Sequence, residues 1–158
     1  MHSGSRSLAG ANNYSRASVE QSALVLDRVT VLSDRFVLLV RIPEGRPRYT
    51  TPEMAQRARA LRPALSVHAC VNDRGTTFDS VIECTSIPHL LEHVMIDIQT
   101  EQGTRPDTVF TGTTRWIDEV KGTARVEVSF ESDMGAFAAL EKALDTLDEI
   151  ASPLANLS

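Results

Sequence analysis

The chain has 158 residues, a formal net charge of −5 and two cysteines, Cys70 and Cys84. This length suits one domain, which we place at residues 21–152, between a flexible or partly ordered segment (1–20) and a short tail (153–158). The acidic balance and the lack of a basic stripe argue against a nucleic-acid partner, because such a partner requires clustered Lys and Arg. No apolar stretch approaches the roughly 20 residues that cross a bilayer. Since no signal-peptide pattern is present either, we expect a cytoplasmic protein with reduced thiols and no membrane partner.

Hydrophobic periodicity and turn residues predict strands and helices in the order ββα…αββα. In chain order, the expected elements are strands over 24–32 and 35–42, a helix from Pro52 to about Arg62, a loop or short hairpin over 64–84, a helix from Ile87 to about Gln102, strands over about 108–117 and 124–131, and a helix over about 133–151. This order is typical of an α+β fold in which helices pack on a mainly antiparallel sheet.

The helix predicted over 87–102 is apolar on more than one side. Ser86 and Pro88 are typical of a helix start. Apolar residues then recur around the helix: Leu90, Leu91, Val94, Met95, Ile96 and Ile98. A surface helix carries a single apolar stripe, so we expect this helix to be largely buried.

Three ionisable residues, His89, Glu92 and His93, interrupt this apolar helix. Residues three and four apart are neighbours on a helix, so the three side chains share one patch. Two imidazoles one turn apart can bind a zinc ion, and the glutamate of a His-x-x-Glu-His sequence is typical of the general base in a zinc hydrolase. The competing interpretation is a hydrogen-bonded core cluster, because a five-residue match can arise by chance. We favour the metal site, with His89 and His93 as ligands and Glu92 as catalytic base, because ionisable groups are costly to bury without partners.

The third ligand has to come from another part of the chain, because a catalytic zinc ion usually has three protein ligands and one open position. We expect a carboxylate, and the candidates are Glu127 and Glu131 on the polar face of the last predicted strand. An alternative zinc site would combine His68, Cys70 and Cys84, whose spacing matches no common zinc-finger pattern. Buried cysteines that act as small apolar residues are the simpler interpretation.

Segments on both sides of the helix carry a further pattern. They are Pro63-Ala64-Leu65-Ser66-Val67-His68-Ala69-Cys70 upstream, and Gly112-Thr113-Thr114-Arg115 and the strand from Val126 to Glu131 downstream. Together with the helix and the opening Leu8-Ala9-Gly10-Ala11-Asn12, they resemble the N-terminal domain of cyanophycin synthetase over nearly the whole chain. In that family's pattern a glutamate follows the aromatic residue of the strand, which favours Glu131 over Glu127 as the third ligand.

The resemblance implies two roles. In some cyanophycin synthetases this domain is similar to a zinc metallopeptidase that cuts the aspartate–arginine polymer into primers, and in others it only binds and presents the polymer. We therefore expect a stand-alone domain that acts as a zinc-dependent hydrolase on a peptide or isopeptide bond, with a cyanophycin-like polymer among its substrates. The alternative is a non-catalytic polymer- or protein-binding domain with a structural or vestigial metal site. A homodimer and a separate partner synthetase both stay open.

Arg115 is a further catalytic candidate. A guanidinium group offers paired donors that can orient a substrate carboxylate or stabilise an oxyanion. The alternative role of Arg115 is an ion pair at the surface or at the end of a strand.

Overall fold

The computed structural model describes residues 16–103 and 105–152. Most of the predicted N-terminal segment and the whole predicted tail, 153–158, lie outside the described residues, as does the opening motif at Leu8–Asn12. The elements are the helices α1 (Arg16–Gln21), α2 (Pro52–Leu61), α3 (Ile87–Gln102) and α4 (Asp133–Ala151), the strands β1 (Val25–Val31), β2 (Arg35–Arg41), β3 (Gly112–Asp118) and β4 (Thr123–Ser129), and the short 3-10 helices η1 (Pro63–Val67) and η2 (Phe78–Ser80). The predicted α+β class is confirmed.

The four strands form one antiparallel sheet in the order β1-β2-β4-β3. β2 and β4 pair in the middle, with Phe36 opposite Val128, so the two halves of the chain meet in one sheet. Within the described part of the chain, β3 pairs only with β4 and therefore forms an edge of the sheet. Side chains alternate along β4: Ala124, Val126 and Val128 are buried, whereas Arg125 and Glu127 between them are partly exposed, as a sheet covered on one face requires.

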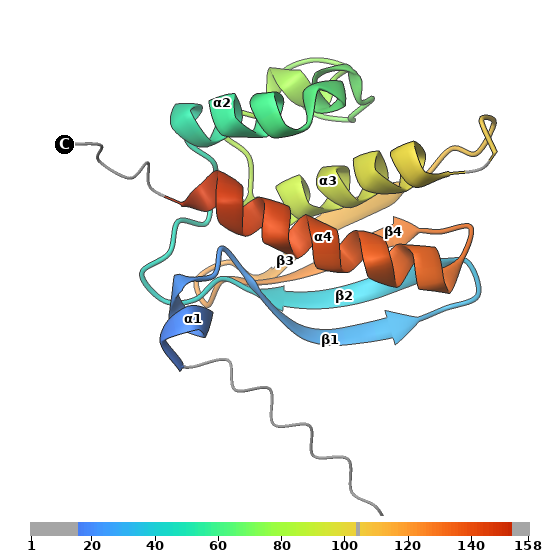
Figure 1. Ribbon diagram of the computed structural model, residues 1–158. Helices are drawn as coiled ribbons and strands as arrows, with labels where there is room; N and C mark the ends of the chain where they lie inside the picture. The colour runs from blue at the N-terminus through green and yellow to red at the C-terminus, as the bar shows by residue number, and fades with distance from the viewer. Residues whose placement is uncertain (1–15, 104, 153–158) are drawn as a thin grey trace, which may run out of the picture.

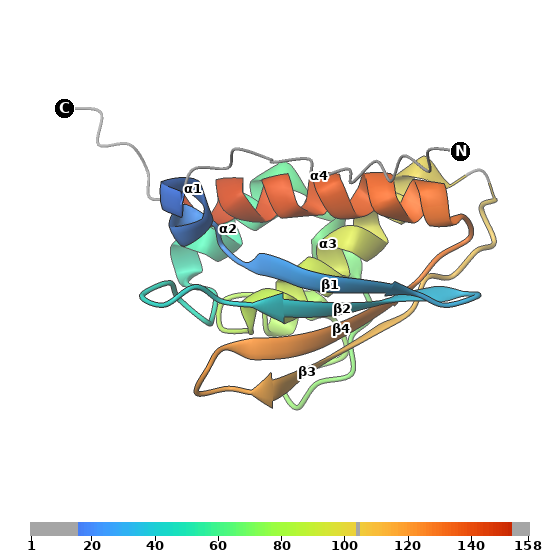
Figure 2. The same cartoon turned by 90° about the horizontal axis from the view of Figure 1, so that it is seen from below.

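The helices α3 and α4 cover one face of this sheet, and α2 lies on the far side of the helix layer (Figures 1 and 2). Among the described residues, none of the helices combines the length and the apolar character needed to cross a membrane.

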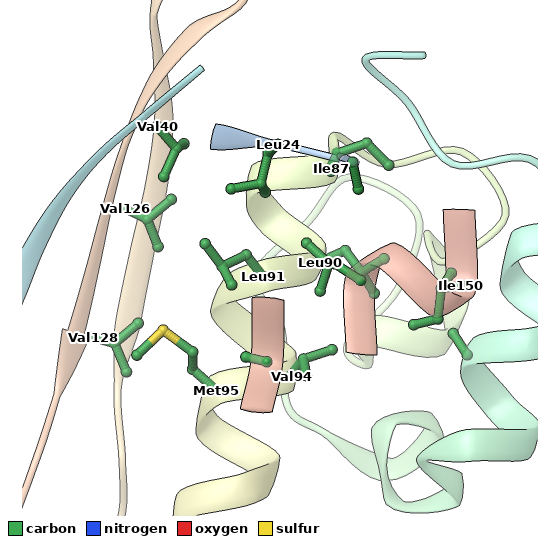
Figure 3. Close-up of a cluster of buried hydrophobic side chains, with 14 of the residues drawn as sticks. Leu24, Val40, Ile87, Leu90, Leu91, Val94, Met95, Val126, Val128 and Ile150 are labelled. Atoms are coloured by element: carbon green, nitrogen blue, oxygen red, sulfur yellow. The ribbon is translucent and has the colours of Figure 1, made fainter. Parts of the chain in front are cut away.

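The core lies between α3, α4 and the sheet (Figure 3). Leu91 and Met95 of α3 point toward Val126 and Val128 of the sheet, and Leu90 lies on the side of α4. These side chains are almost completely buried, as expected of the apolar residues that recur around α3.

α3 begins where the sequence predicts, because Ser86 caps its first turn. The Ser86 hydroxyl accepts a hydrogen bond from the backbone N–H of His89 at 3.2 Å, and Pro88 occupies the first turn, where it displaces no helical hydrogen bond. The helix is buried on its polar side as well: Glu92, His93 and Asp97 are 4–6% exposed. The segment from 68 to 78, which lies within the predicted loop or short hairpin, packs against the two histidines of this polar side.

Candidate metal centre

The polar side of α3 faces an extended stretch, 68–70, which is held by a bridge between Ala69 and Thr77. His68 lies against His93, and Cys70 lies against His89. Two residues of extended chain advance about 6.6 Å. Four residues of helix advance about 6 Å. The spacing between His68 and Cys70 is therefore close to the spacing between His93 and His89. Because the two spacings agree, Cys70 lies next to His89 when His68 lies next to His93.

Cys70, His89 and His93 form a group that could hold a metal ion. Their ligand atoms all lie within 4.8 Å of one another. The Nε2 atoms of His89 and His93 are 3.2 Å apart, and Cys70 Sγ is 3.6 Å from Nε2 of His89. Two nitrogens on a tetrahedral zinc ion lie about 3.3 Å apart, and a nitrogen and a sulfur about 3.5 Å apart. The chemistry of these donors and the two distances that involve His89 fit such an ion.

Contacts on the side away from the donor group fix the orientation of the His89 and His93 rings. Phe78 stacks on His93 with ring centroids 4.1 Å apart and an angle of 19° between the planes. Nδ1 of His89 lies 2.8 Å from the Thr85 hydroxyl, and Nδ1 of His93 lies 3.2 Å from Nδ1 of His68. Because the Nδ1 atoms have these partners, the Nε2 atoms are the ones directed into the group.

Glu92 lies beside the group on the same helix face. The Thr114 hydroxyl donates a hydrogen bond to Glu92 Oε2 at 2.6 Å, and Oε1 is 3.9 Å from Nε2 of His93. Gly112 makes room for this carboxylate, because a Cβ at that position would lie 2.6 Å from Glu92 Cγ and 2.8 Å from the backbone oxygen of Glu127. A side chain on residue 112 would therefore displace either the carboxylate or the strand.

Burial shifts the protonation of these groups. Burial raises the pKa of Glu92 to about 7, although the hydrogen bond from Thr114 opposes the shift. Burial and the neighbouring rings of His89 and His68 lower the pKa of His93 to about 3. Burial also lowers the pKa of His89 and raises that of the Cys70 thiol. At neutral pH the two histidines are therefore uncharged, as metal ligands must be, and the contact between Glu92 and His93 is no ion pair.

A cavity of about 490 Å³ opens beside the group. It is bounded by the chain at 69–71, by the α3 residues His89, Glu92, His93 and Ile96, and by the chain at 109–114. The cavity thus gives a small molecule or a chain segment access to the donor atoms and to the Glu92 carboxylate.

Comparison with protein-family models identifies the family of this domain. The model of the cyanophycin synthase-like N-terminal domain matches residues 36–152, a range that includes β2 except its first residue, β3, β4, α2 to α4 and every residue of the site. The chain belongs to this family. A search of curated proteins finds no match.

The cyanophycin synthase-like domain does not bring Glu127 or Glu131 to the histidine pair. α3 packs on the apolar face of β4, so Glu127 projects from the opposite face, where Arg125 and Thr113 donate hydrogen bonds to its carboxylate. Glu131 is exposed just beyond β4 and borders a separate hollow with Gln99. The third donor that the structure supplies is Cys70.

Arg115 and Cys84 also lie apart from the group in this domain. Arg115 alternates with Thr114 along β3, so its side chain projects from the face of the sheet opposite α3 and is exposed. Cys84 is exposed as well, whereas Cys70 is half-buried. The sequence signal that singles out Cys70 is its spacing from His68, because two residues separated by one in an extended segment face the same side.

Proposed function

We propose that this domain is a zinc-dependent peptide hydrolase in which His89, His93 and Cys70 hold the ion and Glu92 is the catalytic base. The observation that carries this proposal is the convergence of one thiol and two imidazole nitrogens within 4.8 Å of one another, with a carboxylate beside them. Three protein ligands would hold the ion, the number that is usual for a catalytic zinc.

Zinc in such a site supplies Lewis acidity, which lowers the pKa of water toward about 7. Glu92 then takes the proton of the attacking water and later returns it to the leaving nitrogen, so the carboxylate is unchanged after one cycle. The hydrogen bond from Thr114 leaves Glu92 Oε1 as the oxygen on the side of His93.

The outer edge of β3 has no strand partner among residues 16–103 and 105–152, and this favours a peptide as the substrate. The backbone N–H of Ser129 donates to the carbonyl of Thr111, and hydrogen-bonded pairs alternate along an antiparallel ladder. Gly112 and Thr114 therefore direct their backbone N–H and C=O groups away from β4, toward the open edge. An extended peptide can pair with this edge as an added strand, and residues 111–114 also line the cavity at the site.

The cavity wall favours recognition of the substrate backbone over that of charged side chains. Val71, Val109 and Phe110 contribute apolar surface, and the described residues that line the cavity include no Lys or Arg. Pairing with β3 is independent of the substrate's side chains, so we propose an extended peptide with neutral residues at the cleaved bond. A cyanophycin-like polymer is the second probe.

Metal content tests the ligand set. We expect the protein, purified without a His-tag, to hold one zinc ion per chain by mass spectrometry, and to lose it in His93→Ala and in Cys70→Ser. Cys84→Ser is the matched control, because Cys84 is exposed and lies outside the group. A protein that takes up no zinc, or a Cys70→Ser variant with full zinc content, would contradict this ligand set.

Hydrolysis tests the role of Glu92. Glu92→Gln should keep the zinc ion and lose about 10²–10⁴-fold in turnover, the usual contribution of a general base. The assay compares neutral peptides with the cyanophycin-like polymer by mass spectrometry. Zinc-loaded protein that binds these probes and cleaves none of them would instead support a non-catalytic binding domain.

A further inference from the structure

The hydrogen bonds of the site continue beyond the metal ligands to a buried carboxylate and an arginine. Nδ1 of His93 contacts Nδ1 of His68 at 3.2 Å, and Nε2 of His68 contacts Asp97 Oδ1 at 3.3 Å. The other oxygen of Asp97 accepts from Arg62 Nε at 2.5 Å. The chain of contacts links α3 to the end of α2 through a residue of the segment 68–70.

This chain of contacts is built into the interior of the domain. The side chains of Asp97, Arg62 and His68 are 8%, 12% and 13% exposed. Burial alone would raise the pKa of Asp97, but the hydrogen bonds from His68 and Arg62 outweigh it and hold that pKa below its usual value. Asp97 is therefore an ionised acceptor on both sides. An ion pair at this depth is costly to bury, so packing alone gives little reason for it.

The ionised carboxylate determines where the protons lie. Because Asp97 can only accept, Nε2 of His68 carries the proton that is donated to it. With that proton on Nε2, the other ring nitrogen, Nδ1, faces Nδ1 of His93 at 3.2 Å, where it can accept the N–H of His93. A neutral His93 that is protonated at Nδ1 has its free electron pair on Nε2, the atom directed toward His89 and Cys70.

We infer that His68 is a positioning residue of the metal centre: with Asp97 and Arg62 behind it, it fixes the tautomer and the ring orientation in which His93 Nε2 can bind the ion. Phe78 controls the tilt of the same ring from its face, whereas His68 controls which nitrogen is protonated. This inference rests on the proposed zinc site and adds the residues that make His93 a ligand.

Zinc affinity of His68 variants, measured by competition with a chromophoric chelator, tests the inference. His68→Leu removes the acceptor for His93 and should weaken zinc binding by about 10–100-fold, the usual effect of losing such a partner. His68→Asn keeps an oxygen near the position of Nδ1, so its loss should be smaller, below about tenfold. The visible spectrum of the cobalt-substituted protein should change in His68→Leu and resemble wild type in His68→Asn.

The matched control is Asp79→Asn. Asp79 accepts a hydrogen bond from Arg59, which lies on α2 as the residue three positions before Arg62, and neither of them contacts His93. Its loss should disturb the packing of α2 and leave zinc affinity and the cobalt spectrum unchanged. Circular dichroism of each variant shows whether it folds.

The outcomes separate this inference from the proposed function. If wild type binds zinc and His68→Leu has the same affinity and cobalt spectrum, the positioning role is overturned and the zinc site stands. The positioning role is also overturned if Asp79→Asn weakens binding as much as His68→Leu does. If wild type itself binds no zinc, the proposed function falls and the positioning role falls with it.

Discussion

Helix α3 is buried on two sides whose chemistry differs. On one side, Leu91 and Met95 pack against the sheet and make contacts that are apolar and have little directional requirement (Figure 3). On the other side, His93 and Asp97 are buried to nearly the same extent, but each has a polar partner at a defined distance. His68 contacts both of them, and Arg62 contacts Asp97. Equal burial therefore results from packing on one side and from matched polar pairs on the other.

The difference shows where stability and function lie in this helix. Apolar burial stabilises by about 25 cal/mol per Å² regardless of what exactly covers the surface. Buried polar groups contribute little net stability and become costly when a partner is lost. Burial opposes the ionisation of Glu92 on the polar side, so removing that charge should stabilise the fold, whereas truncating an apolar side chain on the other side should destabilise it.

The largest effect is expected from Leu91→Ala on the apolar side. Leu91 is completely buried, and its truncation should lower the free energy of unfolding by about 3–5 kcal/mol, because the transfer term and the cavity term add. Urea unfolding measures the loss, which should not change with zinc or with pH between 5 and 8. Leu61→Ala, at the exposed end of α2, should cost less than about 1 kcal/mol. Equal losses in the two variants would contradict this assignment of the core.

The sequence predicts most of the fold because local signals agree with the tertiary structure. Ser86 and Ser132 cap their helices through hydrogen bonds within four residues, so the start of α3 and of α4 can be read locally. The alternation along β4 likewise determines which of its faces is covered. The structure of the segment 64–84 is harder to predict from the sequence, since its short 3-10 helices and the bridge between Ala69 and Thr77 depend on contact with α3.

The site is predicted only where its residues are close in sequence. His89, Glu92 and His93 share a helix face by spacing alone. The third donor depends on which face of β4 packs on α3, and the apolar face does, so Glu127 is directed away. Cys70 reaches the histidines through an extended segment whose path is set by Phe78 and by the bridge at Ala69. No local periodicity encodes that path.

An effect of opposite sign is expected from Glu92→Gln in metal-free protein. Folding raises the pKa of Glu92 from 4.5 to about 7, so the folded state binds more protons than the unfolded state between these values. The associated stability is present below pH 4.5 and is lost as the pH rises through 7, a change of about 3 kcal/mol. Glu92→Gln, which keeps an acceptor for Thr114, should therefore be more stable than wild type at pH 8 by up to about 3 kcal/mol, and nearly equal to it at pH 4.5.

Glu127→Gln is the control with the reverse dependence. A hydrogen bond from Arg125 lowers the pKa of Glu127, so this carboxylate stabilises the fold above its unfolded pKa and that stability is lost on acidification. Its replacement should slightly destabilise the protein at pH 8. Unfolding curves in chelator across this pH range measure both variants. A Glu92→Gln variant that is less stable than wild type at pH 8 would mean that the buried carboxylate has a stabilising partner.

The smallest effect is expected from the loss of a helix N-cap, and it tests whether zinc binding depends on the first turn of α3 or on overall stability. Ser86→Ala and Ser132→Ala each remove one N-cap hydrogen bond of 3.2 Å and should each cost about 1 kcal/mol of stability. Ser86 receives its hydrogen bond from the backbone of His89, so its loss frees the turn that holds one metal ligand. Ser132 caps α4, away from the group. Zinc affinity should therefore fall in Ser86→Ala and stay unchanged in Ser132→Ala, although the two unfolding curves shift alike. Equal losses of affinity would show that zinc binding follows global stability, and the first turn of α3 would then have no separate role in presenting His89.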